Sequence, residues 1–135
     1  MEEIKRLFKK DNFAANAGIE LLEVSPGYAK ACMRIEEKHL NALNTVQGGA
    51  IFTLADLAFA AASNAHGNVA VAINVNISFV KAATKGVLTA EAKETSINPK
   101  IATYTVNVTD DKGELVAIFQ GMGYRKKAPL DFSEV

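Results

Sequence analysis

Apolar and small residues dominate one long segment near the middle of the chain. Residues 50–62 contain neither glycine nor proline and are rich in alanine and leucine, so they predict a long helix. The apolar residues that cover most of its helical wheel are Ile51, Leu54, Leu57, Ala58, Phe59, Ala61 and Ala62. A helix that is apolar nearly all round is surrounded by other structure. We therefore expect the rest of the chain to wrap around it.

The remaining pattern is that of strands joined by short turns. Residues 18–36 form two apolar runs separated at residues 25–27, and the second run alternates with polar residues, which is typical of a hairpin with one face in solvent. Further strands are predicted over residues 69–82, 87–97, 101–109 and 114–125. Short turns at residues 84–86, 98–100 and 110–113 predict an antiparallel meander, whose apolar face only the long helix can cover.

The two ends of the chain have different patterns. Residues 2–10 place apolar side chains at helical spacing, which predicts a short amphipathic helix that serves as a lid or packing element. Residues 126–135 are expected to be loosely held. The 135 residues contain no linker or repeat, so residues 1–135 are expected to form a single domain of α+β class: a curved antiparallel sheet wrapped around one long central helix.

Charge balance and cysteine usage narrow the possible functions. Lys plus Arg and Asp plus Glu number fifteen each, so no global field attracts nucleic acid or an acidic membrane. The single Cys32 excludes an internal disulfide, and with only His39 and His66 beside it we expect no metal site and no cofactor. The sequence offers no membrane-spanning segment and no signal peptide. We expect a soluble, cytoplasmic protein that binds neither nucleic acid nor membrane.

One acidic residue stands out in the central helix. Asp56 is the only Asp, Glu, Lys or Arg between Lys38 and Lys81. A buried carboxylate is costly unless it is paired, hydrogen-bonded or used, so a functional role is the favoured interpretation. Steps of three or four residues place it in one stripe of small and polar side chains that suits a slot: Gly49, Thr53, Asp56, Ala60 and Ser63.

Two glycines stand where the helix begins. Without side chains at Gly48 and Gly49, an oxygen atom of a ligand can approach the first-turn N–H groups, which have no partner inside the helix. Close packing alone explains paired glycines equally well. Asp56 lies about 12 Å further along the helix, too far to act on the same small group. An antiparallel copy of the helix across a two-fold axis would bring Asp56 of one chain toward Gly48 of the other.

At these residues the sequence resembles the hot dog fold, and specifically the PaaI-like acyl-CoA thioesterases. The motif of that family is an Asn, five variable residues, His-Gly-Gly, and then Leu-Ala-Asp with the acid nine residues after the His. The matching residues here are Asn41, Gln47-Gly48-Gly49 and Leu54-Ala55-Asp56. The similarity continues to residues 121–125 and so covers nearly the whole chain. Two positions depart from it, because Gln47 replaces the His and Ala60 replaces a hydroxyl-bearing residue.

The resemblance implies thioester hydrolysis at a site shared by two chains. The Gly48 N–H would stabilise the oxyanion, Asp56 would act as general base or as nucleophile, and Asn41 would orient the water or the carbonyl group. The substrate would be an acyl-CoA with an apolar acyl or aryl group. The residues expected to bind it are Gln47, Gly49, Ala60 and Asn64. The expected assembly is a homodimer that pairs into a dimer of dimers, a homotetramer.

Two other functions remain open at this point. A hot dog dehydratase or hydratase needs a His paired with an acid to move the α-proton, and the position of that His holds Gln47. A non-catalytic module that binds acyl-CoA would have little use for Asp56. Several basic residues could bind the phosphates of coenzyme A by charge: Lys81, Lys85, Lys100 and residues 125–127. The alternative interpretation is that they are solvated surface groups.

Overall fold

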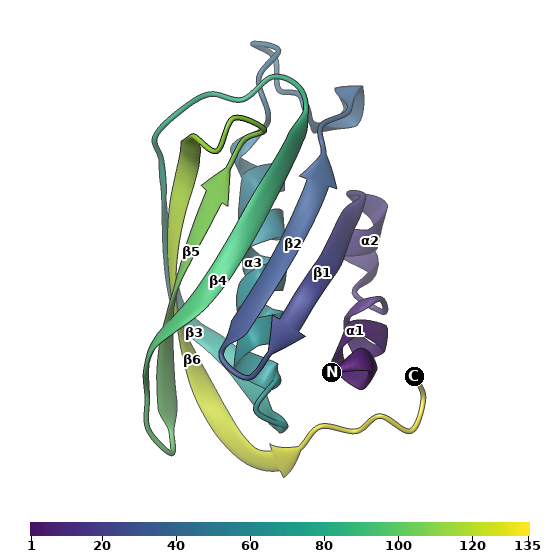
Figure 1. Cartoon of the computed structure of the whole chain (residues 1–135), viewed down its shortest axis with the longest axis vertical. Helices are drawn as coiled ribbons and strands as arrows, with labels where there is room; N and C mark the ends of the chain where they lie inside the picture. The colour runs from purple at the N-terminus through teal and green to yellow at the C-terminus, as the bar shows by residue number, and fades with distance from the viewer.

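The computed structural model describes residues 1–135 and shows a six-stranded sheet curved around one long helix (Figure 1). Its elements are α1 (Glu2–Phe8), α2 (Asn12–Asn16), β1 (Ile19–Ser25), β2 (Tyr28–Arg34), the 3-10 turn η1 (Glu37–His39), α3 (Gly48–Asn64), β3 (Asn68–Phe79), β4 (Val87–Ile97), β5 (Ile101–Thr109) and β6 (Leu115–Pro129). The strands follow the order β1-β2-β4-β5-β6-β3, and every neighbouring pair is antiparallel. The predicted α+β architecture is confirmed.

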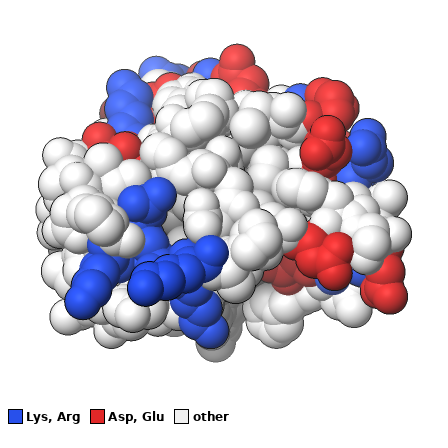
Figure 2. Space-filling model, turned by 90° about the horizontal axis from the view of Figure 1, so that it is seen from below, with Lys and Arg blue, Asp and Glu red and all other residues white.

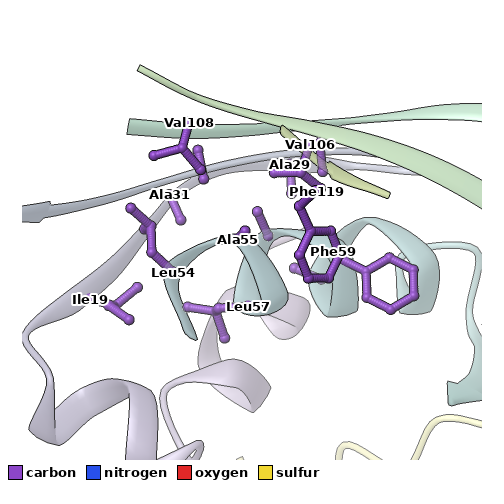
Figure 3. Close-up of a cluster of buried hydrophobic side chains, with 14 of the residues drawn as sticks. Ile19, Ala29, Ala31, Leu54, Ala55, Leu57, Phe59, Val106, Val108 and Phe119 are labelled. Atoms are coloured by element: carbon purple, nitrogen blue, oxygen red, sulfur yellow. The ribbon is translucent and has the colours of Figure 1, made fainter. Parts of the chain in front are cut away.

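Helix α3 packs against the inner face of the sheet along its apolar side. That face is lined by small residues on the strands nearest the helix, among them Ala29, Ala31, Ala90 and Ala92, all fully buried. Small side chains on these strands let the helix lie close to the sheet. Larger side chains such as Phe59 and Phe119 fill the rest of the core. Figure 3 shows Phe59 of α3 beside Phe119 of β6, with ring centroids 5.6 Å apart. Gly121 allows this approach, because a Cβ there would lie 2.8 Å from the Phe59 ring.

The predicted meander is wrong at one step. Strand β3 pairs with β6 at the far edge of the sheet and not with β4, the next strand in the sequence. Residues 80–86 therefore form a crossover, in which the N–H groups of Val80 and Lys81 both donate to the carbonyl oxygen of Val116. Glycine and polar residues mark a break between strands, but they do not show whether the chain returns beside the strand it has just left.

The two ends of the chain are more ordered than the sequence indicated. The predicted helix over residues 2–10 is confirmed as α1, and α2 follows it, capped by an Asp11 carboxylate that accepts the Ala14 N–H at 3.0 Å. The prediction of a loose tail from residue 126 is wrong for residues 126–129, because β6 continues to Pro129 and pairs with Asn68. None of the helices has the length and hydropathy needed to cross a bilayer.

Candidate active site

The first turn of α3 leaves one backbone donor free. Gly48 is the first helical residue, and no oxygen atom of the chain accepts its N–H. The Gln47 side chain caps the helix by accepting the Gly49 N–H, so that second donor is occupied. A Cβ on Gly49 would lie 2.6 Å from the Gln47 Oε1, so a larger residue there would force the capping side chain to shift. The Gly48 N–H therefore remains for an oxygen atom of a ligand.

Gln47 has a different contact from the one the sequence suggested. Its Oε1 is committed to the helix, and only its amide N–H₂ group is left for a substrate. Gln47 therefore acts as the N-cap residue, a position that Ser, Thr, Asn or Asp usually occupies. An amide neither gains nor loses a proton near neutral pH, so Gln47 cannot act as an acid or a base.

A cavity of about 480 Å³ lies beside this end of α3. Its walls come from α3, from α2 and from the segment before the helix, and include Gln47, Gly49, Ala50, Thr53, Phe13, Ala17 and Leu40. The Phe13 ring is 74% exposed and is free to contact a ligand. Sequence reasoning missed Phe13 because it missed α2, although Asp11 two residues earlier is a typical N-cap signal.

Buried His39 fixes the wall of this cavity. Its Nδ1 accepts the Glu36 N–H at 2.9 Å, and its Nε2 donates to the Ala17 carbonyl oxygen at 2.6 Å. These partners define the neutral tautomer with the proton on Nε2. The carbonyl oxygen of His39 also accepts the Gln47 N–H at 2.8 Å, so one residue ties α2 to the start of α3. The role of His39 is therefore to position the site.

Asp56 is a half-buried carboxylate without a partner in its own chain. Burial is the main cause that raises the pKa of its carboxyl group above the ordinary value, and the negative charge of Asp11 on α2 is the second. Such an unpaired acid is more typical of a functional site than of a packing position. Eight residues separate it from Gly48, which is about 12 Å along the helix. One chain therefore does not bring these two groups together.

Asn41 shapes the loop that leads into α3. Its Oδ1 accepts the N–H groups of Leu43 at 2.9 Å and Thr45 at 3.2 Å, and its Nδ2 donates to the Thr45 hydroxyl at 3.0 Å. These bonds use the oxygen fully and leave one N–H of the amide without a partner. The structure thus shows a turn-forming role and keeps one donor available.

Asn64 and Ala60 lie nearer the other end of α3. The Asn64 amide donates to the carbonyl oxygens of Ala60 and Ala70 and accepts the Ala70 N–H at 3.0 Å. The bond to Ala60 stays within α3 and the two bonds with Ala70 join the helix end to β3, which leaves no donor for a substrate. Ala60 is partly exposed and shares the helix face of Asp56.

Other reactive groups do not gather into a site. Cys32 lies on β2, where burial first and the nearby Glu20 second raise the pKa of its thiol. A nucleophilic thiol needs the opposite shift, so Cys32 is not a candidate nucleophile. No three His, Cys, Asp or Glu side chains converge in a way that suits a metal ion.

A free N–H at a helix start, an apolar cavity beside it and an unpaired carboxylate are the parts of a hydrolytic site. The family model of the Thioesterase superfamily matches residues 43–117, more than half of the chain. The chain belongs to this superfamily, and its activity is thioester hydrolysis at the level of the family.

Individual relatives agree with this assignment. The acyl-coenzyme A thioesterase PaaI of Escherichia coli is 31% identical over 120 residues, which are 88% of this chain and 86% of PaaI. The structure of E. coli PaaI, from the phenylacetic acid degradation operon, matches with a TM-score of 0.91 at 28% identity and covers 96% of this chain and 95% of PaaI. A variant of PaaI from Thermus thermophilus matches with a TM-score of 0.82 at 35% identity, covering 86% of this chain and 100% of that one. These matches confirm the hot dog fold.

Proposed function

We propose that this protein hydrolyses the thioester bond of an acyl-coenzyme A with an apolar acyl or aryl group. The observation that carries the proposal is Asp56, a half-buried carboxylate with no partner, on a helix whose first N–H is also free. Membership of the Thioesterase superfamily and similarity to PaaI support the reaction class. Residues 1–135 act as one hot dog domain in this proposal.

The reaction follows from the two groups. The thioester oxygen accepts the Gly48 N–H, and the positive end of the α3 dipole stabilises the negative charge that develops on it. Asp56 either removes a proton from the attacking water or attacks the carbonyl carbon itself. In both routes the C–S bond breaks and the thiolate of coenzyme A takes up a proton, from protonated Asp56 in the first route and from water in the second. In the second route the acyl group is left on Asp56 as a mixed anhydride, which water then hydrolyses, so both routes give a carboxylic acid and the thiol of coenzyme A. The free N–H of Asn41 orients the water or the carbonyl group.

The cavity that Gln47 and Gly49 border suits the acyl group. Phe13, Ala17 and Leu40 supply apolar contacts, and the free amide N–H₂ of Gln47 supplies a polar one. Gly49 contributes a surface without a side chain, and Ala60, about one helical turn beyond Asp56, presents only a methyl group on the same helix face. Aromatic and aliphatic walls favour an apolar acyl or aryl group over a charged one.

The active site is shared between two chains in this proposal. Gly48 and Asp56 lie too far apart along one helix, and an antiparallel second helix would pair each with the other. Strand β3 supports such pairing because it is the edge strand of the sheet and carries exposed apolar residues, with Ile73 and Phe79 each 53% exposed. In this proposal two such dimers associate into a homotetramer in the cytoplasm. Contact between the dimers is supported by the outward-facing residues of β5, which carry no charge: Thr103, Thr105 and Asn107.

Turnover of a panel of acyl-CoA thioesters by the wild type and by Asp56→Asn tests this function. The isosteric amide keeps the shape of the side chain, so the melting temperature should not fall, whereas kcat should fall by about 10²- to 10⁴-fold. Asp131→Asn removes a carboxylate from the exposed tail and serves as the control. Binding of acyl-CoA without turnover by the wild type would instead identify a non-catalytic binding module.

A further inference from the structure

His39 is the one buried side chain of a type that ordinarily changes its charge near neutral pH. Charged side chains lie at the surface, as Figure 2 shows for one face of the molecule, and no Lys, Arg, Asp or Glu residue is buried. His39 is 4% exposed. A second proton on its ring would therefore place a positive charge inside the protein, which is costly unless a partner compensates it.

The contacts of the His39 ring fit its neutral form alone. Nδ1 faces the Glu36 N–H at 2.9 Å, and a proton on Nδ1 would set two donors against each other. The imidazole ring is rigid, so a turn that moves Nδ1 away from Glu36 also moves Nε2 away from the Ala17 carbonyl oxygen, which it contacts at 2.6 Å. Protonation is therefore expected to break both contacts.

No carboxylate is hydrogen-bonded to this ring. The charged residues of its own turn are all exposed: Glu36, Glu37 and Lys38. The Glu36 carboxylate accepts the backbone N–H of His39, and the Lys38 Nζ lies 3.5 Å from the same carboxylate. On the elements that contact the ring, residues 12–17 and 40–55 carry no charge, and Asp11 caps α2 at its opposite end. These partners leave a second proton on the ring uncompensated.

His66, the other histidine of the chain, has the opposite kind of partner. Its Nε2 lies 2.7 Å from the Glu94 carboxylate, where an added proton would complete an ion pair. Acid therefore favours the contact of His66 and opposes the contacts of His39. The two histidines provide a matched comparison within one protein.

Helix α2 depends on hydrogen bonds more than on burial. It has five residues, too few for a helix that is stable alone, and Ala14 is its only buried residue. Its carboxyl end is held by His39 and, at the exposed surface, by Lys38, which donates to the Asn16 carbonyl oxygen at 2.9 Å. Loss of the buried contact would release α2 and with it Phe13, the aromatic ring that α2 contributes to the cavity.

We propose that His39 is a pH-sensitive positioning residue for the acyl group: neutral His39 holds α2 and Phe13 at the wall of the cavity, and protonation of His39 releases them. The inference rests on the proposed function, in which this cavity receives the acyl group. His39 acts through α2 and does not touch the reacting atoms. Acid should therefore raise the KM for an acyl-CoA through His39, while Asp56 governs the pH dependence of kcat.

Two substitutions separate the two contacts of the ring. His39→Gln places an amide N–H₂ group near the position of Nε2 and keeps a donor for Ala17, but it cannot take up a proton. The Glu36 N–H that it leaves free belongs to an exposed residue and can bind water. His39→Asn places an amide oxygen near the position of Nδ1, so it keeps the acceptor for Glu36 and loses the bond to α2. His66→Gln removes the other histidine and serves as the control.

The KM for an acyl-CoA with a large apolar acyl group is measured at about pH 7.5 and about pH 5.5, on either side of the range in which histidine ordinarily titrates. Titrating groups of the substrate affect all the proteins alike, so the ratio of the wild-type KM to the KM of His39→Gln isolates His39. This ratio should rise about fivefold as the pH falls, because one hydrogen bond contributes about that factor to an equilibrium. His39→Asn should have a raised KM at both pH values. The kcat of His39→Gln should follow the wild-type pH profile, and His66→Gln should keep the wild-type change in KM.

Amide hydrogen exchange of the free protein tests the same step without turnover. After correction for the intrinsic pH dependence of exchange, a peptide that covers residues 12–18 should lose protection at the lower pH in the wild type and keep it in His39→Gln. His39→Asn should lack this protection at both pH values. A peptide from the middle of α3 should stay protected in every protein, which shows that the fold is intact.

Three results would overturn the proposal. They are a KM ratio that does not change with pH, equal protection of residues 12–18 at both pH values in the wild type, and a pH dependence of KM that disappears in His66→Gln instead. If the wild type hydrolyses no thioester, the proposed function fails, and hydrogen exchange alone decides whether His39 holds α2. Loss of protection in acid that is confined to proteins with His39 supports this role, and equal protection in the wild type and His39→Gln overturns it.

Discussion

Gln47 stands where the related motif has a histidine, and its side chain serves the helix directly. Its Oε1 caps α3 through the Gly49 N–H, and its amide nitrogen borders the cavity. Because an amide does not change protonation near neutral pH, this position cannot exchange protons with the substrate. Gln47 instead stabilises the start of the helix and forms part of the wall of the cavity that is proposed to hold the acyl group.

Gln47 variants should separate these two contributions. Gln47→Ala removes the cap and should lower the free energy of unfolding by about 0.5–2 kcal/mol, while kcat stays within about tenfold of the wild type. Gln47→His should change the rate or the preference among acyl groups without being needed for turnover. Denaturant unfolding and kcat on the same preparations measure both effects. If Gln47→Ala is as inactive as Asp56→Asn, Gln47 takes part in the chemistry itself.

The pH dependence of turnover should report Asp56 and its neighbour Asp11. In the proposed mechanism activity needs the Asp56 carboxylate, so kcat/KM should rise with pH through the Asp56 pKa, which burial and the charge of Asp11 place above the ordinary 3.8. Asp11→Asn removes that charge, and the rise should move to lower pH. Asn caps a helix as well as Asp, so α2 should persist. Glu37→Gln removes a surface carboxylate as the matched control and should leave the pH profile unchanged. If the profile of Asp11→Asn is also unchanged, Asp11 does not influence the titrating group.

Isolation in the sequence singled out some residues of the candidate site and could not single out others. Asp56 and Gly48 stand out in the sequence itself, one as a lone charge and the other as a missing side chain at a helix start. The side chains of Asn41 and Asn64 form hydrogen bonds with backbone groups that come near them only in the folded chain. Phe13 enters the cavity through the packing of α2, for which the sequence has only a weak cap signal.

At the scale of elements, α3 is the one whose role the pattern predicted most fully. Its apolar wheel indicated burial, and the structure extends it to Gly48–Asn64. The position of β3 was not predictable in the same way, because an amphipathic strand can pair on either edge of a sheet. Its exposed apolar residues fit an edge strand that meets another chain.

The start of α3 permits a clean removal of its free donor. Gly48→Pro deletes the N–H at the first helical position, where proline is tolerated, and Gln47 before it already has the extended conformation that proline requires. We expect kcat to fall by about 10²- to 10³-fold with the fold retained. Gly48→Ala keeps the N–H and adds a Cβ 3.0 Å from the exposed Phe79 ring, which can move aside. Equal losses in the two variants would mean that the effect is steric.

At the scale of the whole molecule, one chain contains both groups of the proposed mechanism, Gly48 and Asp56, but does not bring them together. The helix keeps Gly48 and Asp56 about 12 Å apart, and no motion within a regular helix shortens that distance. In the proposed dimer a two-fold axis would solve this problem with two equivalent sites, each using Gly48 of one chain and Asp56 of the other.

Subunit mixing tests this arrangement. Gly48→Pro and Asp56→Asn should each be nearly inactive as pure proteins, and they are unfolded and refolded together so that their chains exchange. A mixed dimer would have one site with both lesions and one intact site, because the two residues serve opposite sites. Random pairing makes about half of the dimers mixed, so about a quarter of the wild-type activity should return. If both residues serve the site of their own chain, every site carries a lesion, and proven exchange without recovery refutes the shared site.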